Sequence, residues 1–235
     1  MSIAEKLITI AENEQSISNG INTESDLIAE IKSMVDNLPE AAGGGENLLV
    51  YATRMDYLFE NAVFPDGYEI TINAPNLGHM MSYMFLNAKG VRKITMNVPI
   101  EGIDHSAHTF AYGTNVEEIV FPDGIKFFLV NSFASSVKTL KSIFGRIDLS
   151  GSTNNTTMLN GCWGLENVSF MPNTIKANFT IAHSELLTDA SIQSIIDGLA
   201  EVETAKTLTL NAKVGAKLTD EQKATITAKN WTLVY

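Results

Sequence analysis

The feature that most constrains this chain is a repeat in its middle part, with a period of roughly 25 residues. Four aliphatic residues mark equivalent positions at almost equal intervals: Val91, Val116, Leu140 and Leu165. A second apolar residue follows each of them three positions later: Ile94, Ile119, Ile143 and Val168. Units of this length bury their apolar row only by stacking on one another, so the period predicts a solenoid with one short strand per unit.

Other positions of the unit repeat as well. A bulky apolar residue precedes the aliphatic position by six places at Phe85, Phe110 and Leu159, and by seven at Phe133. Two places beyond the second apolar position stand Met96, Phe121 and Phe170, whereas the third unit has Gly145 there. The string Phe64-Pro65-Asp66-Gly67 returns at residues 121–124, which favours a decayed first unit around it. We therefore expect about five units over residues 48–182.

These residues resemble the leucine-rich repeats of the BspA-like type, in which a Phe and a six-residue gap precede Leu-x-x-Ile-x-Ile/Phe-Pro. The segment from Phe110 to Pro122 matches this pattern best. The resemblance implies an α/β leucine-rich-repeat solenoid with short strands. It also implies a packing role for the lone cysteine, Cys162, at a position that the family fills with a small residue.

Residues 1–40 are predicted to be helical, because apolar residues recur there at helical spacing. The residues that we expect to mediate self-association are Ile3, Leu7, Ile10, Leu27, Ile31 and Leu38. A glycine-rich linker at residues 41–47 separates these helices from the repeats, so they have little of their own protein to pack against. The prediction is a homo-oligomer, for example a trimer; the alternative is that the helices fold back as a cap on the solenoid.

Residues 183–235 are predicted to form an α/β cap, since the terminal units of a solenoid are usually atypical. Thr188 and Thr219 each occur in a Leu-Thr-Asp string and are typical residues to begin a helix. Gln222 lies three places after Thr219 and predicts a capping box. Strands are expected at residues 207–210 and 231–234.

Both ends of the chain look like proteins encoded by phages and prophages of gut Firmicutes. The residues that carry this similarity are 1–13 at the start and 207–233 at the end. It implies a tail, fibre or head-decoration component that binds other virion proteins and a bacterial surface protein or glycan. Its location would be the virion, after synthesis in the host cytoplasm without a signal peptide. The alternatives are a bacterial cell-surface adhesin and an envelope carbohydrate-active enzyme, which would need a pair of carboxylates flanking a cleft.

Charge and motifs bear on several functional classes. The formal net charge of -11 disfavours nucleic acid as a partner, and no apolar run is long enough to predict a membrane span. Motifs of hydrolases, nicotinamide enzymes and zinc proteases do not occur, so we expect neither an enzyme nor a cofactor. The pair His105 and His108 comes nearest to a metal site, but further ligands at a typical spacing are missing.

The ligand-contact surface is expected on the outward strand positions, which alternate with the buried ones. The candidate contact residues are Arg92, Lys93, Glu117, Glu118 and Asn167, and Thr95 and Val120 are outward positions of the same strands. Trp163 is a further candidate because a large aromatic stands where other units have Lys89 and Thr114. The alternative is that Trp163 folds over the edge of the solenoid and covers Cys162. The polar loop from Ser150 to Thr157 is predicted to be a hydrogen-bonding tip or a long exposed turn.

Overall fold

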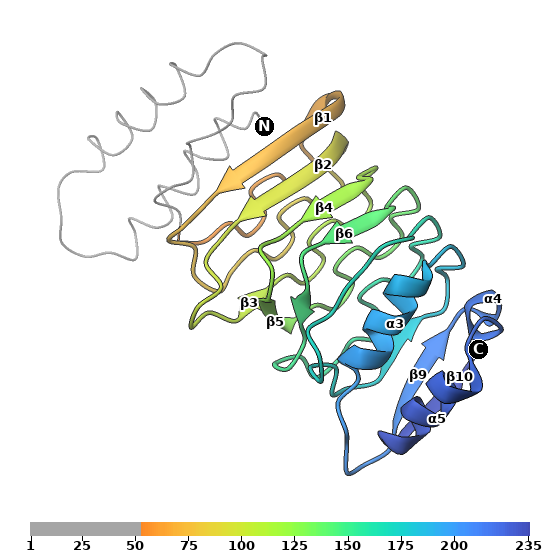
Figure 1. Cartoon of the computed structure of the whole chain (residues 1–235). Helices are drawn as coiled ribbons and strands as arrows, with labels where there is room; N and C mark the ends of the chain where they lie inside the picture. Colours follow the sequence, from red (N-terminus) through yellow and green to blue (C-terminus); the bar gives the residue numbers. More distant parts are fainter. Residues whose placement is uncertain (1–52) are drawn as a thin grey trace, which may run out of the picture.

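The computed structural model describes residues 53–235 and shows a mixed α/β chain with parallel strands and few helices (Figure 1). The predicted helices of residues 1–40, the six side chains expected to mediate self-association and the glycine-rich linker lie outside the described residues. Within residues 53–235, no helix has the length and apolarity needed to cross a lipid bilayer.

The largest sheet has four parallel strands in the order β1-β2-β4-β6. They are β1 (Val63–Asn73), β2 (Lys89–Asn97), β4 (Glu118–Val120) and β6 (Ser142–Phe144). Ile94 pairs with Ile119, and Ile119 pairs with Ile143, so the predicted alignment of these three positions is confirmed. Each strand is therefore a neighbour of the strand one period further along the chain, and the strands form a stack (Figure 1).

A second sheet of short parallel strands lies apart from the first (Figure 1). It consists of β3 (His105–Ser106), β5 (Ile125–Leu129) and β7 (Ile147–Asp148). β5 pairs with β3 through His105 and Phe127 and with β7 through Ile125 and Ile147. Within one period, the chain thus contributes one strand to the first sheet and one to the second before the next period begins.

The core lies between the sheets and the turns. All four predicted aliphatic positions are buried, and so are the bulky residues that precede them. The rings of Phe59, Phe85, Phe110 and Phe133 contact each other in succession at centroid distances of 5.0, 5.5 and 5.3 Å. Burying apolar surface in one continuous column is the main source of stability for stacked units that cannot fold alone.

Backbone hydrogen bonds shift the predicted alignment of the turns by one position. The Phe85 N–H donates to the Phe110 carbonyl, and the Ala111 N–H donates to the Phe133 carbonyl. Phe85 is therefore in line with Ala111, not with Phe110 as the spacing predicted. The rings still meet because Phe110 fills the same part of the core from the neighbouring backbone position.

The two Phe-Pro-Asp-Gly strings occupy different places. Residues 64–67 lie inside β1, where the pairing with β2 shifts register between Val63 and Tyr68. Residues 121–124 instead connect β4 to β5. The string therefore does not mark equivalent positions of two units, although the strand expected for the first unit is in place. The strand predicted at residues 68–72 is present in β1 and pairs with β2.

The C-terminal part alternates strands and helices as predicted. A parallel sheet has the order β10-β9-β8. Its elements in chain order are β8 (Phe179–Ile181), α3 (Asp189–Gly198), β9 (Lys206–Leu210), α4 (Ala212–Gly215), α5 (Asp220–Ala228) and β10 (Trp231–Val234). Thr188 caps α3, and Thr219 with Gln222 forms the predicted capping box of α5. The short helix α4 was not predicted, and β8 joins the cap sheet across the predicted boundary at residues 182 and 183.

Candidate binding surface

The outward face of the β1-β2-β4-β6 sheet brings the predicted charged contact residues together. Paired positions place Glu69 beside Lys93, Lys93 beside Glu118, and Glu118 beside Ser142. A bridge from Ser142 adds Asn167 to this row. We call Glu69, Lys93, Glu118, Ser142 and Asn167 the charged row. Lys93 and Glu118 reach one face because the buried apolar positions alternate with them along β2 and β4, whereas Ser142 in β6 is itself buried.

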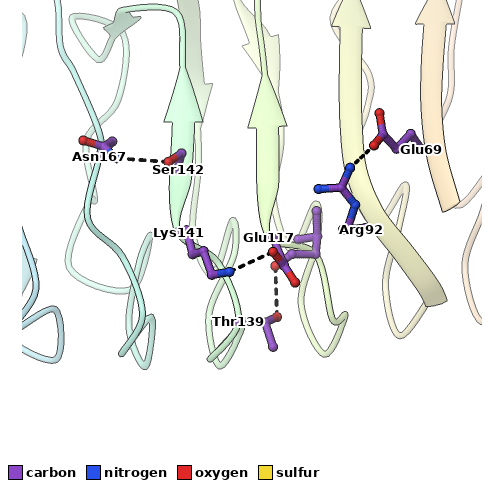
Figure 2. A network of polar contacts seen from close by, with 8 residues as sticks. Glu69, Arg92, Glu117, Thr139, Lys141, Ser142 and Asn167 are labelled. Carbon is purple, nitrogen blue, oxygen red and sulfur yellow. Dashed lines mark hydrogen bonds and ion pairs between the residues drawn. The ribbon is translucent and has the colours of Figure 1, made fainter. Parts of the chain in front are cut away.

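Charges of opposite sign meet from strand to strand on this face. Arg92 contacts Glu69, and the Lys141 Nζ lies 2.9 Å from Glu117 Oε2 (Figure 2). The Lys93 Nζ lies 3.2 Å from Glu118 Oε2. The uncharged Asn167 donates from Nδ2 to Ser142 Oγ at 3.1 Å (Figure 2). Each predicted charged contact residue is therefore paired across the strands. Lys93 and Glu118 pair with each other, whereas Arg92 and Glu117 pair with Glu69 and Lys141, which were not predicted.

The ion pair between Glu117 and Lys141 changes how both groups titrate. The hydrogen bond and charge of Lys141 hold the pKa of the Glu117 carboxyl below its ordinary value. The same contact raises the pKa of Lys141. Both side chains lie in solvent, where salt and water weaken such a pair. These contacts fix which side chain faces which, and they contribute little to stability one by one.

A second outward row is uncharged and becomes apolar toward β6. Thr71 pairs with Thr95, Thr95 with Val120, and Val120 with Phe144. We call these four residues the neutral row. The side chain of Phe144 is 46% exposed, although it is a large aromatic. Phe144 was not among the predicted contact residues, although the spacing of Thr95 and Val120 makes it the next outward position.

An exposed ion pair and a tight turn follow Phe144. Gly145 has a φ of +84°, and a Cβ there would lie 2.3 Å from the Phe121 carbonyl oxygen, so only glycine fits this position. Arg146 then donates from Nε to Asp123 Oδ1 at 2.9 Å. The side-chain hydrogen bonds from Arg146 lower the pKa of Asp123 to about 2. A charged rim thus stands next to the exposed ring, and the irregularity of the third unit has a steric cause.

Trp163 lies outside both rows and is 49% exposed. Its ring packs against His183 with a centroid distance of 4.7 Å. The Gly161 N–H donates to His183 Nδ1 at 3.1 Å and fixes the imidazole in place. His183 is a second residue of this site that sequence reasoning did not connect with Trp163, because the two rings come from different turns of the stack.

Cys162 has the packing role that the resemblance implied. Its side chain is fully buried, and Sγ donates to the Ala134 carbonyl at 3.0 Å. Burial raises the pKa of the thiol to about 12, so the thiolate is not populated near neutral pH.

One of the two histidines of the candidate metal pair, and part of the polar loop, are buried and do not lie on the surface. His105 is buried, and its Nε2 lies 2.7 Å from the Pro99 carbonyl oxygen. Burial lowers the pKa of His105. Within residues 53–235, no group of three or more His, Cys, Asp or Glu could hold a metal ion. The loop from Ser150 to Thr157 is not exposed throughout its length, because Ser152 and Asn155 are buried.

No protein-family model, no curated protein and no solved structure matches the chain.

Proposed function

We propose that this chain is a leucine-rich-repeat solenoid that works by binding and carries out no catalysis. The stacked parallel strands, the contacting Phe rings and the buried aliphatic positions support this assignment. Each unit contributes one outward strand segment, and stacking these segments gives a broad surface that suits a macromolecular partner. The resemblance to BspA-like repeats supports the same conclusion.

The observation that carries the proposal is the exposed ring of Phe144 at the apolar end of the neutral row. Binding surfaces concentrate their affinity in a few aromatic anchors that are surrounded by a polar rim. Phe144 and Val120 would supply the anchor, and the pair of Asp123 and Arg146 would form part of the rim. The charged side chains of the charged row already form ion pairs within this protein. They would therefore orient a partner and contribute little to its attraction.

The proposed setting is a phage virion, where the chain is a tail, fibre or head-decoration protein that displays the repeats toward a host surface protein or glycan. This part of the proposal rests on the resemblance of both chain ends to phage-encoded proteins. A bacterial cell-surface adhesin is the alternative setting. Immunogold labelling with an antibody against the repeats separates the two, because label on purified virions supports the first and label on uninfected cells supports the second.

The binding surface is tested with intact cells from a panel of gut Firmicutes. The variant Phe144→Ser removes the exposed ring, and Phe128→Ser is its matched control, because Phe128 is 39% exposed on β5 in the other sheet. We expect Phe144→Ser to weaken binding of the full-length chain to the cells by roughly tenfold or more. Phe128→Ser should bind like the unaltered chain.

Equal binding by both variants and the unaltered chain would exclude the neutral row as the contact surface. The variant Trp163→Ser, measured beside them, then reports whether the surface around His183 is used instead. A chain that binds neither cells nor virions would contradict the proposed function as a whole.

A further inference from the structure

The turn before Trp163 contains the dipeptide Asn160-Gly161, whose chemistry the proposed function does not use. An asparagine followed by glycine is the dipeptide most prone to succinimide formation, since no Cβ shields the glycine nitrogen from the side-chain amide. Asn160 is exposed, and within residues 53–235 its side-chain amide makes no hydrogen bond. The reacting carbonyl carbon is therefore open to solvent and is not held away from the backbone by a partner.

The glycine nitrogen has an uncommon hydrogen-bond acceptor. The Gly161 N–H donates to His183 Nδ1 at 3.1 Å, although in folded proteins most backbone N–H groups donate to carbonyl oxygens. A neutral imidazole nitrogen is a much stronger base than an amide oxygen. General bases act on a proton at this heavy-atom distance. The proton that must leave the nucleophilic nitrogen thus already points at a base.

The position of the imidazole is set by the fold. Its ring packs against Trp163, and its Nδ1 accepts from Gly161, so the proton of the neutral ring is on Nε2. Neither the indole of Trp163 nor the backbone of Gly161 carries a charge. The nearest charged residue along the chain is Glu185, whose Oε2 lies 2.7 Å from Lys213 Nζ. Gly161 itself has a φ of +79°, which a residue with a side chain rarely adopts.

We infer that Asn160 is a site of spontaneous deamidation in which His183 is the general base. The Gly161 nitrogen attacks the Asn160 side-chain carbonyl carbon and its proton passes to His183 Nδ1. The C–N bond of the side-chain amide then breaks, and ammonia leaves after taking up that proton. Water opens the resulting succinimide at either carbonyl and gives aspartate or isoaspartate at position 160. No oxidant or cofactor takes part.

The reaction changes the surface around Trp163. Either product adds a negative charge at position 160, and isoaspartate also lengthens the main chain by one carbon atom. The Asn160 carbonyl accepts a hydrogen bond from the Ser136 N–H at 2.7 Å, so a longer main chain disturbs the contact between two stacked turns. Ageing of the protein would therefore alter this face while the neutral row keeps its residues.

The test is peptide mapping by mass spectrometry of the full chain, incubated at pH values from 6 to 9. Asn19-Gly20 has the same dipeptide and serves as an internal reference, although it lies outside the described residues. We expect the rate at Asn160 to rise less steeply with pH than the rate at Asn19 and to level off, because its base is a side chain held by the fold and not hydroxide. The rate at Asn19 should keep rising about tenfold per pH unit, because hydroxide is its base.

The variant His183→Phe keeps a ring against Trp163 and removes the base. It should slow deamidation at Asn160 roughly tenfold or more at pH 7.5 and leave the rate at Asn19 unchanged. A pH profile at Asn160 that parallels Asn19, a faster rate in the variant, or an amide that survives while Asn19 converts would each overturn the inference. The profile of the unaltered chain decides the question even if the variant fails to fold.

Discussion

Among single residues, Asn155 is the least expected in its place. Its side chain is fully buried, and within residues 53–235 neither Oδ1 nor Nδ2 has a hydrogen-bond partner. The Ala134 N–H donates to the Met158 carbonyl, and this alignment puts Asn155 in line with the buried Val130. A polar side chain therefore stands where the preceding unit has an aliphatic one, and its unpaired groups cost stability.

Replacing Asn155 by valine should raise the free energy of unfolding by about 1–3 kcal/mol, since the substitution removes two unpaired polar groups and keeps a similar volume. Urea denaturation followed by circular dichroism measures the change. The reciprocal variant Val130→Asn is the control and should lower the free energy of unfolding. A loss of stability in Asn155→Val would mean that the amide has a partner in solution.

At the scale of elements, Lys229 joins α5 to the end of α3. Its Nζ donates to the carbonyls of Ile196 at 3.0 Å and Leu199 at 2.6 Å, and it also contacts the carbonyl of Asp197. The last carbonyls of a helix lack partners within the helix and carry partial negative charge, so a cation there is favourable. Partial burial lowers the pKa of this lysine, which still serves as the cap of a helix that lies well before it in the chain.

The variant Lys229→Met should lower the free energy of unfolding by about 1–2 kcal/mol, because the C-terminal carbonyls of α3 lose their charged donor. The melting temperature from calorimetry reports the effect. Lys223→Met in α5 is the matched control, since among residues 53–235 its Nζ reaches only Asp220, at 3.8 Å on the surface. If both variants melt together with the unaltered chain, the contacts of Lys229 do not stabilise α3.

At the scale of the whole molecule, charges alternate in sign from strand to strand on the outward sheet. β2 carries Arg92 and Lys93, the next strand segment carries Glu117 and Glu118, and Lys141 precedes β6. Like charges on neighbouring strands repel, and opposite charges attract. The order of the strands in the stack therefore agrees with the order of the charges, in addition to the apolar contacts below them.

Reversing one charge of an ion pair should destabilise the stack of strands, and reversing the partner charge as well should restore part of the stability. Glu117→Lys places basic side chains next to one another around position 117 and should lower the melting temperature by a few degrees. Adding Lys141→Glu re-creates an ion pair and should recover part of the loss. The double-mutant cycle in low salt isolates the coupling, and high salt should shrink it. A coupling free energy of zero would show that the alternation of charges does not stabilise the stack.

The period of the apolar residues could be found from the sequence alone because stacking of equivalent units requires chemically equivalent buried positions. The same holds for the capping box of α5, whose residues interact within one turn. The same spacing could have predicted that Phe144 points outward. The burial of Asn155 could not be predicted in this way, because the polar composition around it indicated an exposed loop. Only the hydrogen bonds to the neighbouring unit decide that this side chain faces the core.

The sequence by itself determined the repeat length, the buried face of each strand and the residues that begin α3 and α5, all of which depend on local chemistry and regular spacing. Only the tertiary structure decided the contacts between units: Trp163 on His183, Gly161 on the same imidazole, and Lys229 on the end of α3. These contacts join side chains and backbone groups from different turns of the stack. Their partners depend on how far each turn advances the chain, and one more or one fewer residue in a turn changes which side chains meet.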